Sequence, residues 1–310
     1  ALRAADALRA LAERRGFTVR ADEPLVKKTW WRVGGPADAY VEVADLDALR
    51  DLVALAAVHG IPLFPLGNAS NLLVSDRGIR GIVVRLVGGL AGAEQRGATV
   101  ELGGGLKLTS LLKRAERAGW TGLELFAGIP GTVGGAVRMN AGTAVGEVAD
   151  RLIDVTVVES GPDAVVSVLP ASALNLGYRH ADLPTGAVVA SARFALTDGD
   201  PAESKRKVEE HLAYRARTQP VDVPTCGSTF RNPPDDHAGR LIEACGLKGR
   251  RIGGAEVSTK HANFLVNTGD ATAADLKALI SLVQREVEAA TGIRLVPEVH
   301  LAGDWGSEPA

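Results

Sequence analysis

The chain has 310 residues, of which 46% are hydrophobic and 23% charged, and its 35 Lys and Arg against 37 Asp and Glu give a net charge of −2. This composition excludes a disordered or fibrous chain. The near-neutral charge argues against a nucleic-acid or anionic-membrane binder, because both need a basic surface. Glycine is unusually frequent: its 36 residues are about 12% of the chain, against roughly 7% in an average protein.

The first part of the chain, up to about residue 199, combines an N-terminal helix with short strands and two further helices. Residues 1–16 have helical apolar spacing and contain Asp6 and Glu13, which favours a surface helix over a targeting peptide. The next helices are expected over residues 46–59 and 108–118. The strand segments, apolar and bounded by Gly or Pro, are residues 39–43, 61–66, 81–87, 98–102, 153–158, 164–169 and 187–196. We therefore predict an α+β domain over residues 1–199, with its core beginning near residue 29.

The composition of the sequence changes after residue 198. A charged helix is predicted over 201–216, followed by a loop with four prolines over 220–234. A short helix, two short strands, a long amphipathic helix and a last strand follow, at 237–245, 255–257, 263–266, 272–290 and 293–301. A smaller α+β domain is therefore expected over residues 200–310, with its last strand carrying Glu298.

Several common functional motifs are missing. The chain has no G-x-G-x-x-G fingerprint, no P-loop and no G-x-S-x-G elbow. The six histidines form no H-x-x-x-H pair and the two cysteines, Cys226 and Cys245, are far apart, so no metal site is expected. Two cysteines also favour a reducing compartment, and we expect a cytoplasmic protein.

The glycines gather in three segments: 34–35, residue 67 with its neighbours, and 128–142. Glycine lets the backbone approach a ligand closely, and consecutive backbone N–H groups form an anion-binding concavity. A tight turn explains any single segment. Three segments, two of them with interleaved Ser, Thr or Asn, favour a pyrophosphate cradle for a dinucleotide.

Residues 128–142 resemble the flavin-binding signature of the UDP-N-acetylenolpyruvoylglucosamine reductases, also called UDP-N-acetylmuramate dehydrogenases. Six further segments are similar to motifs of this family, in the same order. They are residues 29–37, 67–73, 177–179, 226–233, 258–264 and 297–299.

The resemblance implies an FAD-binding domain of the vanillyl-alcohol-oxidase (PCMH) type followed by a smaller substrate-binding domain. It implies an NADPH-dependent, FAD-mediated reduction of UDP-N-acetylglucosamine enolpyruvate to UDP-N-acetylmuramate, in the synthesis of peptidoglycan and hence in cell-wall biogenesis, cell shape and cell division. The partners would be these small molecules, with no nucleic acid and no membrane, and the protein would be a monomer.

The resemblance also assigns residues to FAD and to the substrate. Those expected to bind FAD are Gly67, Asn68, Ala69, Ser70, Asn71, Leu72, Gly128, Ile129, Gly131, Thr132, Gly134, Gly135, Ala136, Asn140, Ala141 and Gly142. Those expected to bind the substrate are Tyr178, Gly227, Arg231, Asn232 and Lys260.

Three residues are expected to be catalytic. Ser228 would protonate the carbanion at C2, and Arg179 and Glu298 would stabilise the enolate. The planar guanidinium of Arg179 suits a carboxylate. Glu298, beside a developing negative charge, would need a raised pKa or a cationic partner such as Arg179.

The chain departs from the family pattern in three places. Ala69 stands where a glycine is common, and Ala181 where a serine is common after the Tyr-Arg motif. The short interval between Arg179 and Ser228 is that of the shorter type of this enzyme, without the inserted tyrosine that covers the substrate. Two alternatives stay open: a flavin oxidase of a small alcohol, and a non-catalytic flavin-binding module.

Overall fold

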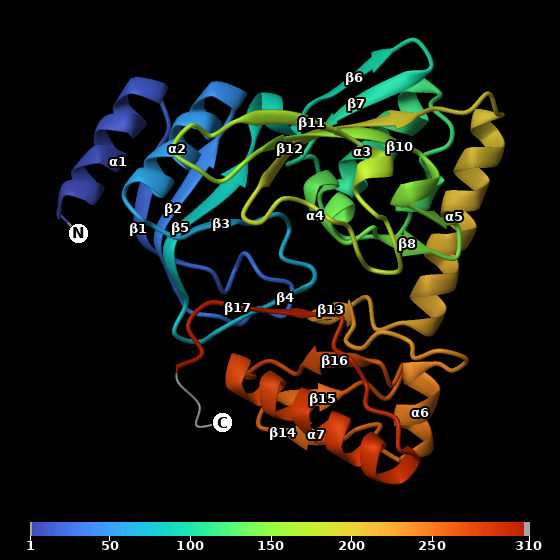
Figure 1. The fold of residues 1–310 in the computed structure, drawn as a ribbon. Coiled ribbons are helices and arrows are strands. Elements are labelled where there is room, and N and C mark those ends of the chain that lie inside the picture. Colours follow the sequence, from blue (N-terminus) through green and yellow to red (C-terminus); the bar gives the residue numbers. More distant parts are fainter. Residues whose placement is uncertain (1, 307–310) are drawn as a thin grey trace. The chain divides into compact units, whose positions relative to one another are not determined.

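The computed structural model describes residues 2–306 (Figure 1). Ala1 of the expected first helix and residues 307–310 of the expected second domain lie outside the described residues. The chain forms two compact units: unit 1 comprises Ala1–Ala21, Ala39–Asn68 and Gly81–Ala213, and unit 2 comprises Asp22–Asp38, Ala69–Arg80 and Tyr214–Ala310.

A four-stranded sheet begins unit 1, in the order β1-β2-β5-β3. Its strands are β1 (Val19–Pro24), β2 (Pro36–Val43), β5 (Ile79–Leu86) and β3 (Leu63–Pro65). Helices α1 (Leu2–Arg15) and α2 (Leu46–Val58) lie side by side (Figure 1). Asp45 caps α2 by accepting a hydrogen bond from Ala48 N at 2.8 Å, and α2 buries Leu49 and Leu52 in a core shared with the sheet.

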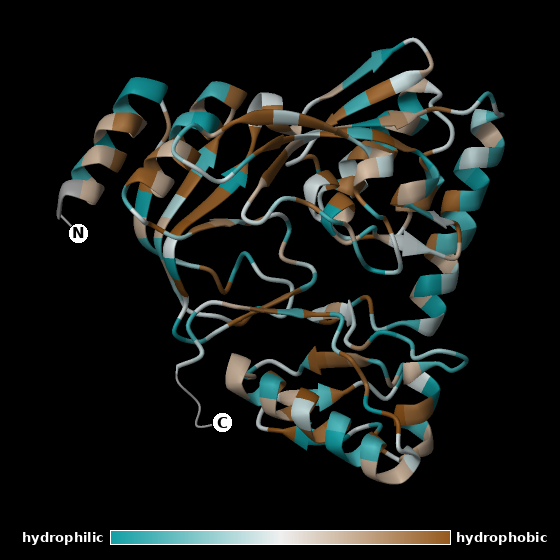
Figure 2. Ribbon diagram, in the orientation of Figure 1, coloured by the Kyte–Doolittle hydropathy of each residue, from teal (hydrophilic) through white to brown (hydrophobic). Residues whose placement is uncertain are grey.

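The second sheet of unit 1 is antiparallel, in the order β11-β10-β12-β7-β6. Its strands are β11 (Val166–Pro170), β10 (Leu152–Val158), β12 (Val188–Ala195), β7 (Thr99–Gly103) and β6 (Ala93–Arg96). Their hydrophobic residues, brown in Figure 2, pack with α3 (Leu108–Ala118) and α4 (Val133–Arg138). Strands β8 (Gly142–Thr143) and β9 (Gly146–Glu147) form a short hairpin, and the 3-10 helices η1 (Gly88–Ala91), η2 (Glu124–Phe126), η3 (Val148–Asp150) and η4 (Ala171–Ala173) complete the unit.

Helix α5 (Pro201–Thr218) begins in unit 1 and ends in unit 2. It has no buried residue and is largely hydrophilic (Figure 2). Its ion pairs include Lys207 with Glu203 at 2.9 Å and Arg206 with Glu210 at 2.7 Å. These (i, i+4) pairs lie on an exposed helix, where solvent screens them and each contributes little to stability.

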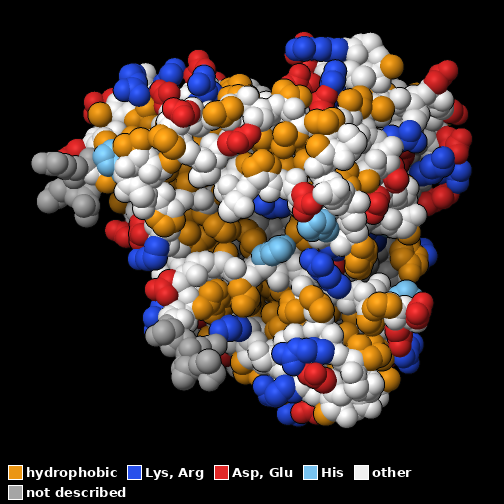
Figure 3. Space-filling model, in the orientation of Figure 1, with side chains coloured by type: hydrophobic (Ala, Val, Ile, Leu, Met, Phe, Trp, Pro, Cys, Tyr) orange, Lys and Arg blue, Asp and Glu red, His pale blue; other side chains and the backbone are white. Residues whose placement is uncertain are grey.

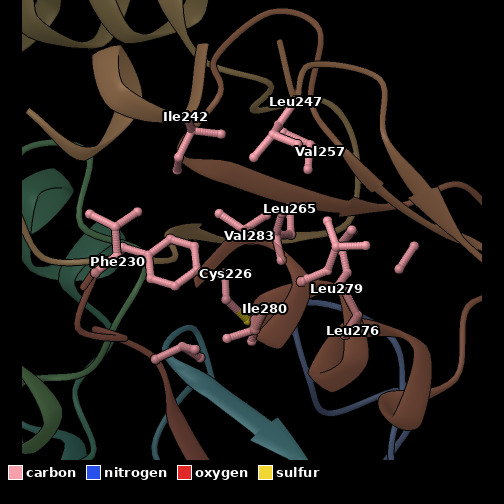
Figure 4. Packing of buried hydrophobic residues seen from close by; sticks show 14 of the residues in the cluster. Cys226, Phe230, Ile242, Leu247, Val257, Leu265, Leu276, Leu279, Ile280 and Val283 are labelled. Carbon is pink, nitrogen blue, oxygen red and sulfur yellow. The ribbon is translucent and has the colours of Figure 1, made fainter. Parts of the chain in front are cut away.

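Unit 2 contains an antiparallel sheet in the order β13-β16-β15-β14. These strands are β13 (Thr225–Ser228), β16 (Phe264–Asn267), β15 (Ala255–Val257) and β14 (Arg251–Ile252), with helices α6 (Ala238–Ala244) and α7 (Ala273–Thr291). Phe230, Leu265, Ile280 and Cys226 point into their common core (Figure 4). Strand β17 (His300–Ala302) pairs in parallel with β4 (Leu72–Val74).

Two early segments, 22–38 and 69–80, belong to unit 2, whereas a division at residue 199 would place them in the first domain. Trp31 is fully buried; its Nε1 donates to Leu265 O at 2.8 Å, and Asn267 Nδ2 donates to Trp31 O at 2.8 Å. The carboxylate of Asp76 accepts from Ala273 N and Ala274 N, both at 2.9 Å, and so adds to the capping box that Thr272 and Asp275 form at the start of α7. Hydrogen bonds between residues far apart in sequence therefore define unit 2.

The long predicted helices are confirmed, but the expected last strand is not. Strand β17 covers only residues 300–302, so the strand expected over 293–301 is wrong for most of its length. Pro297 lacks a backbone N–H for a strand ladder and forms only an isolated bridge with Phe230. Glu298 therefore precedes the strand rather than lying in it.

The surface carries both signs of charge. On the face visible in Figure 3, Lys and Arg side chains are interspersed with Asp and Glu, in keeping with the small net charge of −2. Within residues 2–306, no helix is both long enough and apolar enough to cross a membrane. The same residues contain no cluster of His, Cys, Asp or Glu with the arrangement of a metal site.

Candidate active site

Two of the glycine segments meet in unit 1. A Cβ atom on Gly67 would lie 2.6 Å from Thr132 Oγ1, so only glycine fits there. Asn68 Nδ2 donates to Pro130 O, and Thr132 caps α4 by accepting from Gly135 N. The two segments thus present closely apposed backbone with small polar side chains. Small residues at this point allow the pyrophosphate of a dinucleotide to approach the backbone closely, which larger side chains would prevent.

The start of α4 is held by neighbouring backbone. Val133 N donates to Leu106 O at 3.0 Å, and Gly134 N donates to Gly104 O at 2.8 Å. The N–H of Gly135 is directed at Thr132 Oγ1, 3.5 Å away. These amides therefore serve the packing of α4, and a contact of Gly134 or Gly135 with FAD stays a prediction.

Ala69 adopts a backbone conformation that suits glycine. Its φ is +48°, in the left-handed region, and its side chain is buried. An L-residue in this region costs about 1–2 kcal/mol. The glycine that is common at this position in the family would adopt it freely, so the loop keeps its shape here at a cost in stability.

The three asparagines of the flavin motifs use their side-chain amides to hold backbone carbonyls. Asn68 donates to Pro130 O in unit 1, and Asn71 donates to Glu298 O at 3.0 Å in unit 2. Asn140 donates to Gly177 O at 2.9 Å in unit 1. The structure thus gives each of these expected FAD residues a contact within the protein, and any FAD contact would be additional.

Tyr178 and Arg179 occupy the corner of a tight turn in unit 1. Gly177 and His180 exchange backbone hydrogen bonds, each of 3.0 Å. Arg179 has φ +56°, its Nη2 donates to Gly142 O at 3.1 Å, and its Cζ lies 5.1 Å from the centroid of the Tyr178 ring. Tyr178 is 52% exposed. The turn thus projects an aromatic ring and a guanidinium side by side.

Ser228 ends strand β13 in unit 2, directly after Gly227, which has φ +77° and no atom within 4 Å of a Cβ position. The residues after Ser228 are fixed by Asn263. Thr229 N donates to Asn263 O at 2.8 Å, Phe230 N donates to Asn263 Oδ1 at 2.9 Å, and Asn263 Nδ2 donates to Phe230 O at 2.8 Å. Asn263 was not assigned a role from sequence, although it lies in a matching motif.

Glu298 lies beside this segment in unit 2. Glu298 N donates to Thr229 O at 2.8 Å, and Asn71 holds the Glu298 carbonyl. Unit 2 therefore brings together the backbone around two of the three expected catalytic residues, Ser228 and Glu298. The raised pKa or cationic partner expected for Glu298 stays a prediction.

The remaining expected substrate residues of unit 2 have contacts of their own. Asn232 Oδ1 accepts from Ala238 N at 3.0 Å at the start of α6. Arg231 N donates to Val296 O at 2.9 Å, and Lys260 Nζ donates to Ala216 O at 2.6 Å. Their binding to a substrate stays a prediction.

Cys226 belongs to the core of unit 2 (Figure 4). Its Sγ lies 3.6 Å from Leu72 O, and burial raises the pKa of its thiol to about 12. A thiol that stays protonated is a poor nucleophile. Cys226 is therefore a packing residue.

The fold and the two apposed glycine segments define a flavin-binding oxidoreductase. A sequence family described as "FAD binding domain" matches residues 37–166, and one described as "UDP-N-acetylenolpyruvoylglucosamine reductase, C-terminal domain" matches residues 219–302. The expected fold class, a vanillyl-alcohol-oxidase-type FAD-binding domain followed by a smaller α+β domain, is confirmed.

Similar proteins specify the family. The chain is 47% identical to UDP-N-acetylenolpyruvoylglucosamine reductase of Anaeromyxobacter sp. (strain Fw109-5), over 95% of this chain and 91% of that protein. It is 45% identical to UDP-N-acetylenolpyruvoylglucosamine reductase 2 of Symbiobacterium thermophilum, over 94% and 93%. The crystal structure of the Thermus caldophilus reductase matches with a TM-score of 0.80 and 38% identity, over 92% of this chain and 98% of that one. The chain belongs to the UDP-N-acetylenolpyruvoylglucosamine reductase family.

Proposed function

We propose roles for individual residues in the reaction of this enzyme, the NADPH-dependent and FAD-mediated reduction of UDP-N-acetylglucosamine enolpyruvate to UDP-N-acetylmuramate. The reaction itself follows from relatives that match along almost their whole length. The residue roles rest on the matched motifs and on the geometry within each unit. FAD, which the expected residues of the 67–72 and 128–142 segments would hold, would supply the hydride chemistry that links NADPH to the enolpyruvyl group.

Arg179 is proposed to stabilise the enolate. When a hydride reaches C3, negative charge spreads from C2 into the substrate carboxylate. A guanidinium carries a permanent charge and pairs with a carboxylate through two N–H groups. The Nη2 group of Arg179 donates to Gly142 O at 3.1 Å, and fixed donors of this kind contribute about 3–4 kcal/mol each to transition-state stabilisation.

Ser228 is proposed to protonate C2. A hydroxyl is a weak acid, so it transfers its proton only to a strongly basic carbanion, in concert with charge formation. The Ser228 side chain is partly exposed at the end of β13, and the open space beside Gly227 leaves room for a ligand. The adjacent Glu298 backbone supports a common role for both residues.

Glu298 is proposed to act with Arg179 in holding the enolate. Its backbone is fixed at the N–H by Thr229 and at the carbonyl by Asn71. A carboxylate near a developing negative charge is favourable only when it is protonated or paired with a cation.

We further propose that the enzyme works as a monomer in the cytoplasm, on small-molecule substrates. The near-neutral charge and the two free cysteines support this setting. Sedimentation of the purified protein gives its mass in solution, and a dimer would contradict the monomer.

The test is anaerobic stopped-flow absorbance on purified holoenzyme. NADPH should bleach the flavin and the enolpyruvyl sugar nucleotide should restore its colour. S228A should leave bleaching unchanged and slow recolouring by about 10²–10⁴-fold, the usual contribution of a general acid. S281A, a serine on α7, serves as the matched control and should change neither step.

Each outcome decides one claim. An equal loss in both half-reactions of S228A would show that Ser228 is not the proton donor. A wild-type flavin that NADPH bleaches but the enolpyruvyl substrate does not reoxidise would contradict the function itself. Reduction of the flavin by a small alcohol, followed by reoxidation by oxygen and not by the sugar nucleotide, would favour the flavin oxidase.

A further inference from the structure

Asn140 is one of the most enclosed polar residues of unit 1. It follows α4, has 0% exposure and lies at φ +38° in the left-handed region. Asparagine tolerates this region better than most residues. A buried amide needs hydrogen-bond partners, because an unsatisfied one has lost its hydration without compensation.

Both polar atoms of the Asn140 side chain have partners within unit 1. Nδ2 donates to Gly177 O at 2.9 Å, and Oδ1 accepts from Ala149 N at 2.9 Å. The same amide therefore joins three stretches of chain: the end of the flavin signature, helix η3 and the turn around Arg179.

The turn is tied to the flavin signature at a second point. Gly177, whose carbonyl Asn140 holds, is the first residue of the turn, and Arg179 is its third. The guanidinium of Arg179 donates to Gly142 O at 3.1 Å, two residues beyond Asn140. Residues 140–142 thus hold both the backbone and the charged group of the turn.

Holding matters here because the turn is strained. Arg179 has φ +56°, at the turn position where glycine or asparagine is usual. Such a conformation persists only where surrounding contacts over-determine it. The hydrogen bond from Asn140 is one of these contacts, and it acts directly on the carbonyl that closes the turn.

We propose that Asn140 is a positioning residue for Arg179: it fixes the Gly177–His180 turn so that the guanidinium is held ready for the substrate carboxylate. The proposal rests on the role of Arg179 in the proposed function. It gives Asn140 a task different from the direct FAD contact expected from the sequence.

The first test is N140D. The carboxyl introduced by N140D retains an acceptor for Ala149 N but opposes Gly177 O with a second acceptor. NADPH should bleach the flavin at an unchanged rate, and FAD titration of the apoprotein should give an unchanged Kd. Recolouring by the enolpyruvyl sugar nucleotide should slow by about 10–100-fold, the scale of a 1 Å misplacement. Unchanged recolouring, or loss of FAD binding in both N140D and the uncharged N140S, would overturn the proposal.

The second test is a double-mutant cycle with R179K. R179K should itself slow recolouring, because an ammonium group cannot pair with a carboxylate through two N–H groups. If Asn140 acts through Arg179, N140D should add little to that loss. If the fold-losses of N140D and R179K multiply in the double variant, the proposal is overturned. N175G is the matched control, because Asn175 lies on the same loop at φ +42° but donates only to the exposed Asp182; its recolouring rate should be unchanged. Wild-type recolouring is recorded in the same series, so a failure of the proposed function is seen separately.

Discussion

The segments that carry Arg179 and Ser228 both contain a left-handed residue and are both held by a buried asparagine. In unit 1 the left-handed residue is Arg179 itself, at φ +56°. In unit 2 it is Gly227, at φ +77°, next to Ser228. The strain thus falls on the proposed catalytic residue in one unit and on a neighbouring glycine in the other.

The difference follows from how many positions in each segment must carry a side chain. The turn between Gly177 and His180 has only two central residues, and both Tyr178 and Arg179 supply side chains. In β13 the residue before Ser228 has no proposed catalytic side chain, and glycine can occupy that position, as Gly227 does. A residue keeps a strained backbone conformation when its own side chain is needed at that position. Unit 2 avoids that cost because the needed side chain is one residue away.

The largest expected effect comes from removing the asparagine of unit 2. N263A leaves the N–H and the carbonyl of Phe230 without their partners inside the core. Each buried unsatisfied group costs about 1–3 kcal/mol, so the free energy of unfolding should fall by about 2–6 kcal/mol. Urea unfolding of the holoenzyme measures this change.

A second variant of unit 2 sharpens this prediction. N232A removes an exposed helix cap in the same unit and should cost only about 1 kcal/mol. If N263A costs no more than N232A, Asn263 does not hold the Ser228 segment as the structure indicates.

A moderate effect is expected when the glycine beside Ser228 is replaced. G227A meets no atom within 4 Å but places an L-residue at φ +77°, so it should cost about 1–2 kcal/mol. It should also slow the enolpyruvyl half-reaction, because relaxation of the backbone moves Ser228. Stopped-flow absorbance and urea unfolding report the two effects.

Gly246 offers a matched control for G227A. It has φ +69° and equally open surroundings after α6. G246A should cost a similar amount of stability and leave turnover unchanged. Equal turnover in the two variants would break the link between strain at residue 227 and the position of Ser228.

The smallest effect is expected at Ala69. A69G removes about 1–2 kcal/mol of left-handed strain, while the added freedom of the unfolded chain costs about 0.4–1 kcal/mol. The unfolding free energy should therefore rise by at most about 1.6 kcal/mol, measured by the urea midpoint. A lower midpoint would mean that packing of the buried methyl group outweighs the strain.

The sequence predicted the parts of the fold that have local signals. The cap at Asp45 and the apolar spacing located α2, and the amphipathic pattern located α7. Helix α4 had no such signal, because it is six residues long and contains two glycines, which are poor helix formers. Its start is set instead by hydrogen bonds to Leu106 and Gly104.

The candidate site was predictable as motifs but not as contacts. Residues 67–72 and 128–142 were expected together because both suit FAD, and Gly67 and Thr132 do meet. The bonds of Asn71 to Glu298 and of Asn140 to Gly177 join residues that no spacing rule connects. Trp31 belongs to unit 2 for a similar reason: its hydrogen bond to Leu265 O joins residues that are far apart in the sequence.

The cap that Asp76 provides for α7 has a consequence for biosynthesis. The two partners are 197 residues apart, so at about 5–20 residues per second the cap waits on the order of 10–40 s for its helix. During that time residues 22–38 and 69–80 are without the part of unit 2 that follows them. A fragment beginning at residue 214 would keep the capping box of Thr272 and Asp275 but lack the Asp76 carboxylate and the buried Trp31, so a recombinant unit 2 should include the early segments.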